Sequence, residues 1–429
     1  MTNKPDNMIL SKTQLSTSST SVWLIGPNGR TSLIYAPHQV LWSLWLGYGG
    51  VWLLGYCGVW WVVGSVGGLW VCPLHSYQDL YKVELWYHTN MTSPPYPLNP
   101  EIETLLDPQY VEFYNKYIID QQQVHLQPIE KSRASGTLIP GGGTKRPVSK
   151  IEDFTINRTE TNGENFMVRV FTPVGDAPSG GFPIFLYFHG GGWVLGNIDT
   201  ENVHCTYWAD IGKCICVSVD YRLAPENPFP AAVDDAWEAY LWLVNGGAEK
   251  LGGNINRLGA GGSSAGGNLT AILSHMIIEQ KNLFGASLPL LKYQILIVPV
   301  TDNTANKNTY ESWKKYEYTA ALPAEKMMWY RYHYLPDEKD WTNPKASPLF
   351  YDDKSFALAP PAYIAVAGLD VLRGEGEAYH AKLVKNGIRS TLKVYEGVPH
   401  VVMAMNGVLD KGEELVMDCA NAIREFIAE

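Results

Sequence analysis

A serine between small residues is the first group in this chain whose type and position suit chemistry. Residues 262–266 read Gly-Ser-Ser-Ala-Gly, with Ser264 at the centre. An apolar run precedes them, and apolar residues at helical spacing follow. A serine on a tight strand-to-helix turn is typical of a nucleophile, because the turn exposes the hydroxyl and leaves room only for small neighbours. A glycine-rich loop that happens to hold a serine would give the same pattern.

A second glycine run could supply what such a nucleophile needs from the backbone. Gly190, Gly191 and a third glycine follow His189 directly after an apolar stretch. Attack on a carbonyl places negative charge on its oxygen, which fixed backbone N–H groups stabilise. We predict an oxyanion hole formed by the N–H groups of Gly190, Gly191 and Ala265, the residue after the serine. His189 is predicted to fix this loop rather than to act as a base.

The elements that must position these groups alternate between strand and helix. Short apolar stretches predict strands at 183–188, 214–219, 257–261, 293–298, 362–367 and 391–395, after two earlier ones at 148–156 and 165–172. Helical spacing marks 231–244, 265–280, 374–386 and 409–427. Apolar strands alternating with helices predict an α/β fold: a mostly parallel central sheet with helices on both faces.

A base and an acid should follow the serine along the chain, in the order serine, acid, histidine. Asp370 comes just after the strand at 362–367, and His400 follows the next strand and a turn. Both therefore belong to loops at the strand ends, where a serine's base and its orienting carboxylate are needed. The rival groups lie in helices, in the 302–350 interval or beside other strands: His275, His333, His380, Asp302, Asp352 and Asp353.

Taken in order, these motifs resemble the hormone-sensitive lipase family of α/β-hydrolases. The matching segments are His-Gly-Gly-Gly-Trp at 189–193, Asp-Tyr-Arg-Leu-Ala-Pro-Glu at 220–226, Phe-Pro-Ala-Ala at 229–232 and Gly-x-Ser-Ala-Gly-Gly at 262–267. The resemblance covers about 155–429. It implies an α/β-hydrolase fold with a helical cap and a serine carboxylic ester hydrolase that needs no metal and no cofactor.

The resemblance also implies a role for each matching residue. Ser264 is the nucleophile, His400 the base and Asp370 the acid, and Glu226 braces the loops around the site. Residues 370–374 read Asp-Val-Leu-Arg-Gly and lack the proline and second aspartate of the family pattern. Ser263 stands where an acidic residue is frequent. His-Val-Val at 400–402 also departs from the family pattern. These departures put the shape of the acyl pocket in doubt, but they remove no catalytic group.

Composition and net charge limit the classes of molecule that the protein is expected to bind. The net charge of −10 argues against binding to nucleic acid. The 302–350 interval is rich in tyrosine and tryptophan, which suggests an uncharged small-molecule ester with a short or medium acyl chain. Cys214 and Cys216 alternate with apolar residues and are interpreted as core residues of a buried strand.

The predicted domain plan has three parts. Residues 1–90 form an N-terminal extension, 91–150 supply cap helices, and 151–429 form the catalytic domain with a cap insertion at 302–350. Within the extension, 41–72 is apolar and long enough to cross a bilayer. It is either a membrane anchor, which would make this a single-pass membrane protein, or translated non-coding sequence, which would leave a cytoplasmic enzyme starting near residue 91.

Two other functions stay open. An amidase or deacetylase could use the same three side chains, and membrane-anchored arylacetamide deacetylases resemble this layout. Plant gibberellin receptors also resemble this family as non-catalytic ligand-binding proteins, but they lack the catalytic histidine that His400 supplies here.

Overall fold

The computed structural model describes residues 96–134, 141–284 and 288–428, together with the backbone of six strands between residues 21 and 74. The chain divides into two compact units, Met1–Pro94 and Pro95–Glu429. The division falls close to the predicted end of the N-terminal extension at residue 90.

The first unit contains strands where a membrane-spanning segment was considered. Strands β1 (Ser21–Ile25) and β2 (Thr31–Tyr35) form one antiparallel sheet. A second antiparallel sheet has the order β3 (Trp42–Leu46), β4 (Val51–Tyr56), β5 (Val59–Gly64) and β6 (Trp70–Leu74). Within 41–72, the described residues form short strands and no spanning helix. Among the described helices of the chain, none is both long and apolar enough to cross a membrane.

The second unit is built on an eight-stranded sheet with the order β14-β13-β12-β11-β9-β10-β8-β7. Strands β9 to β14 pair in parallel, while β8 lies antiparallel to both β7 and β10. The strands are β7 (Val148–Ile156), β8 (Phe166–Pro173), β9 (Phe182–Phe188), β10 (Ile215–Asp220), β11 (Gly253–Ser263), β12 (Gln294–Ile297), β13 (Ala362–Ala367) and β14 (Ser390–Tyr395). The predicted mostly parallel sheet is confirmed.

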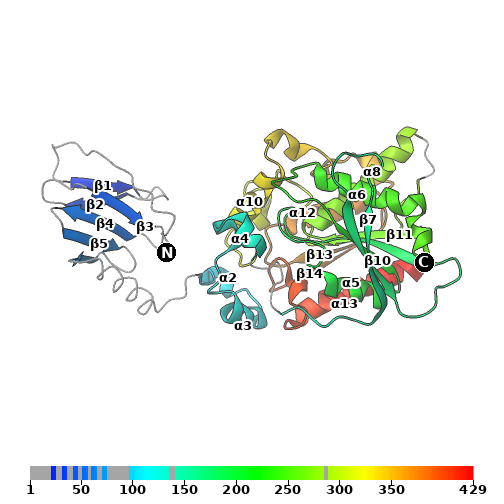
Figure 1. Ribbon diagram of the computed structural model, residues 1–429, viewed down its shortest axis with the longest axis horizontal. Helices are drawn as coiled ribbons and strands as arrows, with labels where there is room; N and C mark the ends of the chain where they lie inside the picture. The colour runs from blue at the N-terminus through cyan, green and yellow to red at the C-terminus, as the bar shows by residue number, and fades with distance from the viewer. Residues whose placement is uncertain are drawn as a thin grey trace, which may run out of the picture. The chain divides into compact units, whose positions relative to one another are not determined.

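Helices cover both faces of this sheet (Figure 1). On one face lie α5 (Asn202–Asp210) and α13 (Asp410–Ala428), which also contact each other. On the other face lie α6 (Ala231–Trp242), α8 (Ala265–Phe284) and α12 (Arg373–Lys385). Two short segments, η2 (Leu243–Gly247) and α7 (Ala248–Lys250), join α6 to β11. The four predicted helices of this region are all present.

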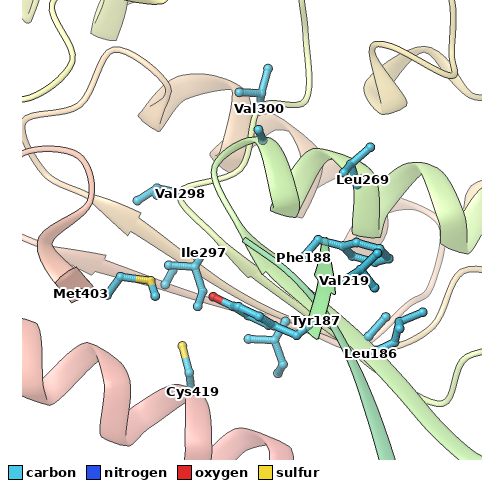
Figure 2. Close-up of a cluster of buried hydrophobic side chains, with 14 of the residues drawn as sticks. Leu186, Tyr187, Phe188, Val219, Leu269, Ile297, Val298, Val300, Met403 and Cys419 are labelled. Atoms are coloured by element: carbon cyan, nitrogen blue, oxygen red, sulfur yellow. The ribbon is translucent and has the colours of Figure 1, made fainter. Parts of the chain in front are cut away.

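Alternating side chains of β9 explain why a fully apolar strand suits this position. Leu186 and Phe188 lie on the side of α8, while Tyr187 points to the opposite side, toward α13 and Cys419 (Figure 2). All four of these residues are fully buried. A strand covered on both faces needs apolar residues at every position. Cys214 and Cys216 are likewise buried free thiols, so their interpretation as core residues is confirmed.

Short helices lie outside this layered core in two stretches of the chain. The N-terminal stretch holds α2 (Pro100–Glu103), α3 (Pro108–Tyr117), η1 (Val124–Leu126) and α4 (Ile129–Ala134). The stretch between β12 and β13 holds α9 (Glu311–Lys315), α10 (Ala324–Tyr334), η3 (Glu338–Thr342), η4 (Pro348–Phe350) and α11 (Asp353–Phe356). Helix α10 contacts η1, so the two stretches meet.

Candidate active site

Ser264 stands alone on a sharp turn between β11 and α8. Its φ of 54° is left-handed, a conformation that costs a non-glycine residue about 1–3 kcal/mol and is found at functional sites. The glycines two positions before and two positions after Ser264 are required because a side chain at either position would clash with the backbone. A Cβ at Gly266 would lie 1.9 Å from the Phe188 carbonyl oxygen, and one at Gly262 would lie 2.4 Å from the backbone of Gly266. The elbow expected from residues 262–266 is present.

Ser264, His400 and Asp370 form a continuous hydrogen-bonded chain. His400 Nε2 lies 2.9 Å from Ser264 Oγ, and His400 Nδ1 lies 2.6 Å from Asp370 Oδ2. The other carboxylate oxygen of Asp370 accepts the Leu372 N–H at 3.0 Å, which fixes the carboxylate in place. All three side chains are buried. This is the geometry that lets a histidine take a proton from a serine while a carboxylate orients the ring.

The other histidines and aspartates considered for the base and the acid make contacts elsewhere. His275 is buried between the Ser355 hydroxyl and the Tyr379 hydroxyl. His380 pairs with Ser390, and the ring of His333 packs against Trp329. The rival carboxylates accept from local donors or pair with a lysine: Asp302 from Thr304 and Tyr310, Asp352 from Ser355, and Asp353 from Lys385.

His189 holds the glycine loop that follows β9. Its Nδ1 lies 2.7 Å from the Gly190 carbonyl oxygen, and its ring stacks on Tyr221 with 4.3 Å between centroids. The Tyr221 hydroxyl donates to the His189 carbonyl oxygen at 2.8 Å. Burial lowers the pKa of His189 to about 4, so the ring stays neutral at physiological pH. These contacts fit a loop-fixing residue.

The donors of the glycine loop differ from the prediction at one position. The Gly190 N–H donates to Glu201 Oε1 at 3.2 Å and is therefore already engaged, which does not support its predicted place in the oxyanion hole. Gly191 and Gly192 have φ values of 124° and 61°, and both line the same cavity as Ser264. Within the described part of the chain, neither of their N–H groups has a hydrogen-bond partner. Ala265 opens α8, where a backbone N–H has no intrahelical acceptor.

Glu201 is a partly buried carboxylate that sequence reasoning missed. It accepts hydrogen bonds from the Ser263 hydroxyl at 2.7 Å, the Tyr187 hydroxyl at 2.7 Å and the Gly190 N–H at 3.2 Å. Burial raises the pKa of this carboxyl group, while its three donors act in the opposite direction. An acidic residue just before a helix looks like an ordinary cap, and its partners are remote in sequence, so no local signal could have identified it.

Glu226 anchors a different part of the surroundings. It accepts two hydrogen bonds from the guanidinium of Arg133, at 2.8 and 2.9 Å. Arg133 also donates to the carbonyl oxygens of Ala224 and Val194. Helix α4 is thereby tied to the segments that follow the glycine loop, in keeping with the bracing role expected for Glu226.

A cavity of about 480 Å³ opens beside Ser264 and His400. Most of its wall is aromatic or aliphatic. It comes from α3, from α10 and the residues just before it, and from the segment after β14: Tyr110, Phe113, Tyr114, Tyr117, Leu322, Met327, Tyr330, Met403 and Met405. The polar lining includes Lys326, Glu201 and three glutamines at 121–123. A mainly apolar cavity with a few placed polar groups is typical of a small-molecule site.

Comparison with known proteins agrees with this geometry. A family model described as an alpha/beta hydrolase fold matches residues 185–404. An AB hydrolase superfamily protein of Schizosaccharomyces pombe is 51% identical over 331 residues, covering 76% of this chain and 96% of that protein. An ethyl acetate hydrolase of Pseudomonas putida is 30% identical, covering 71% and 97%.

The solved structures similar to this chain include a hyperthermophilic esterase of Pyrobaculum calidifontis. It has a TM-score of 0.65 and 31% identity, covering 78% of this chain and 100% of that one. Together the relatives confirm the predicted enzyme class, a serine ester hydrolase. The chain belongs to the α/β-hydrolase fold family, in the branch that resembles hormone-sensitive lipase.

Proposed function

We propose that this protein hydrolyses small carboxylic esters through an acyl-enzyme formed on Ser264. The observation that carries the proposal is the chain of contacts at 2.9 and 2.6 Å that links Ser264 through His400 to Asp370. Ser264, the first residue in this chain of contacts, lines the cavity. A serine that shares a histidine with a buried carboxylate, at the wall of a cavity, is suited to acyl transfer.

The reaction has two halves. His400 takes the hydroxyl proton as Ser264 Oγ bonds to the ester carbonyl carbon, and the carbonyl oxygen becomes an oxyanion. His400 then gives the proton to the departing alcohol, which leaves the acyl-enzyme. In the second half, His400 takes a proton from water as the water oxygen attacks the acyl carbon. Ser264 recovers its proton when the acid is released.

We assign the oxyanion to the N–H groups of Gly191, Gly192 and Ala265, in place of the predicted set with Gly190. The Gly190 N–H is held by Glu201, whereas the other glycine donors line the cavity without a protein acceptor among the described residues. Fixed donors of this kind stabilise the charge that develops in the transition state.

The expected substrates have apolar groups beside the reacting ester. The cavity volume of about 480 Å³ suits short or medium chains, and the aromatic walls favour apolar acyl and alcohol groups. Helices α3, η1 and α4 and the 302–350 insertion contribute to these walls, so we assign them to a cap. The name of the ethyl acetate hydrolase relative is consistent with small esters.

A pre-steady-state burst of p-nitrophenol from p-nitrophenyl butyrate tests the proposal. The wild type should release one equivalent rapidly, and Ser264→Ala should abolish both burst and turnover. Ser149→Ala, at an exposed serine, is the matched control. A folded wild-type protein that hydrolyses no short ester, or a Ser264→Ala variant that retains turnover, would contradict it. Matched anilides measured alongside the esters separate an amidase from an esterase.

A further inference from the structure

Lys326 is a cation in the lining of this mainly apolar cavity. Lys326 is the third residue of α10, and its side chain is partly buried at the cavity wall. Its ammonium donates to the Ala321 carbonyl oxygen at 2.9 Å. In the described part of the chain it has no other hydrogen-bond partner and no carboxylate within ion-pair distance. Two of the three N–H donors of the ammonium therefore have no protein acceptor among the described residues.

The neighbouring side chains do not supply the missing anion. Glu201 lines the same cavity, but its carboxylate already accepts three hydrogen bonds elsewhere. Burial, together with the nearby charge of Lys326, lowers the pKa of His125 to about 4, so this ring is neutral at physiological pH. The buried Gln123 Oε1 and His125 Nδ1 have no partner among the described residues. Of these two residues, Gln123 lines the cavity, so the wall includes a polar atom without a partner among the described residues.

The position of the cation is unfavourable in the absence of a ligand. Burial lowers the pKa of Lys326 to about 8, so the ammonium is still mostly protonated at neutral pH. The first turn of a helix carries a partial positive charge, which repels a cation there and attracts an anion. A charged group in an apolar site is stabilised only by a partner that offsets its desolvation. A negatively charged ligand group would satisfy both the lysine and the start of α10.

We propose that Lys326 binds a carboxylate of the substrate, and that the preferred esters carry such a carboxylate remote from the reacting carbonyl. The inference rests on the proposed function of the Ser264 site and names its substrate class. It replaces the uncharged substrate that the aromatic composition of the insertion suggests. The apolar walls would hold the carbon chain, and Lys326 would select its charged end.

Two pairs of esters, whose members differ by one terminal carboxylate, test this inference. The first pair places the charge on the acyl part: mono-4-nitrophenyl adipate against 4-nitrophenyl hexanoate. The second pair places it on the alcohol part: 4-butanoyloxybenzoate against phenyl butanoate. The measured quantity is the ratio of kcat/KM for the charged ester to kcat/KM for its neutral counterpart. The variants are Lys326→Met, Lys326→Arg and, as a control at an exposed lysine of the same insertion, Lys314→Met.

In at least one pair, Lys326→Met should lower this ratio about tenfold to a hundredfold, the range for removing a charge-assisted hydrogen-bond partner. Lys326→Arg should restore most of the ratio, and Lys314→Met should leave it unchanged. The responding pair identifies which half of the ester faces Lys326. Equal ratios in wild type and Lys326→Met for both pairs would overturn the inference. A folded wild-type protein that hydrolyses none of these esters would instead contradict the proposed function.

Discussion

The Ser263 hydroxyl donates a 2.7 Å hydrogen bond to Glu201 Oε1, and the same oxygen accepts the Gly190 N–H at 3.2 Å. One carboxylate oxygen thus connects the residue before the nucleophile with the first glycine of the neighbouring loop. The Tyr187 hydroxyl holds the other oxygen at 2.7 Å. The nucleophile elbow and the glycine loop are therefore positioned against each other by a partly buried acid, which lies in the segment between β9 and α5.

Replacing Glu201 should impair the chemical step more than substrate binding. Glu201→Ala leaves the Gly190 N–H and the Ser263 hydroxyl without their acceptor, so the glycine loop loses a fixed position. We expect kcat to fall about 10–100-fold, less than the 10²–10³-fold typical of a lost oxyanion donor, with a smaller change in KM. Glu201→Gln keeps one carbonyl oxygen and should recover part of kcat.

Steady-state kinetics on p-nitrophenyl butyrate provide the measurement for Glu201, with Glu249→Gln at an exposed site as the matched control. A structural role alone would lower the melting temperature of Glu201→Ala and leave the kcat of the folded fraction intact. That outcome would remove Glu201 from the positioning of the loop.

Asp370→Asn should leave the fold intact and nearly abolish turnover. An amide at this position can turn its NH₂ group toward His400 Nδ1. Nδ1 would then accept a hydrogen bond, and the ring proton would sit on Nε2, which could no longer serve as a base. The expected loss in kcat is on the order of 10⁴, as for other triads. The measurement is kcat on a p-nitrophenyl ester together with a thermal melt. Asp302→Asn is the comparison, because the hydrogen bonds of Asp302 within the described part of the chain come from Thr304 and Tyr310. A similar loss there would undermine the assignment of Asp370.

Strand and helix positions could be predicted from the sequence because burial on both faces leaves long apolar runs. The predicted strand at 362–367 coincides with β13, in which all residues are buried. Helix α5 was missed, because it is buried on most of its surface and has little contrast between its faces: His204, Cys205, Thr206, Tyr207, Trp208 and Ala209 are all buried. Pattern reasoning depends on such contrast.

Asp370 and His400 could be named from the sequence because each follows a strand of the parallel sheet. The ends of adjacent parallel strands meet at one edge, so order along the chain translates into proximity. Glu201 and Lys326 could not be named in this way. The role of Glu201 depends on Ser263, which is remote in sequence, and that of Lys326 depends on which side of α10 faces the cavity. The three-dimensional packing alone supplies both facts.

Gly266→Ala should prevent correct folding of the elbow. The added Cβ would lie 1.9 Å from the Phe188 carbonyl oxygen and 2.7 Å from that of His189, and neither backbone group can move without disturbing β9. We expect a loss of more than about 3 kcal/mol in the free energy of unfolding, as for severe overpacking. Urea denaturation, monitored by fluorescence, measures this free energy of unfolding. Gly142→Ala, where the nearest atom is 3.8 Å away, is the control and should change stability by less than about 0.5 kcal/mol.

Acid should destabilise the protein before most carboxylates titrate, because several histidines are buried in the neutral form. Burial lowers the pKa of His189 to about 4, of His204 to about 4 and of His275 to about 3, below the 6.5 expected when unfolded. Between pH 6.5 and the lowered pKa, the unfolded chain binds a proton that the native histidine does not. Stability therefore falls with decreasing pH, by up to about 1.4 kcal/mol per pH unit for each histidine.

Urea titrations between pH 7.5 and about 5 measure this dependence above the range of ordinary carboxylates. His275→Gln should reduce the pH dependence of the free energy of unfolding by up to the contribution of one histidine. It also weakens the contacts with Ser355 and Tyr379, so it lowers stability at every pH. His380→Gln is the matched control, because that side chain is only partly buried. Its slope should stay close to that of the wild type. A wild-type stability that is flat from pH 7.5 to 5 would show that these histidines do not remain neutral in the native protein.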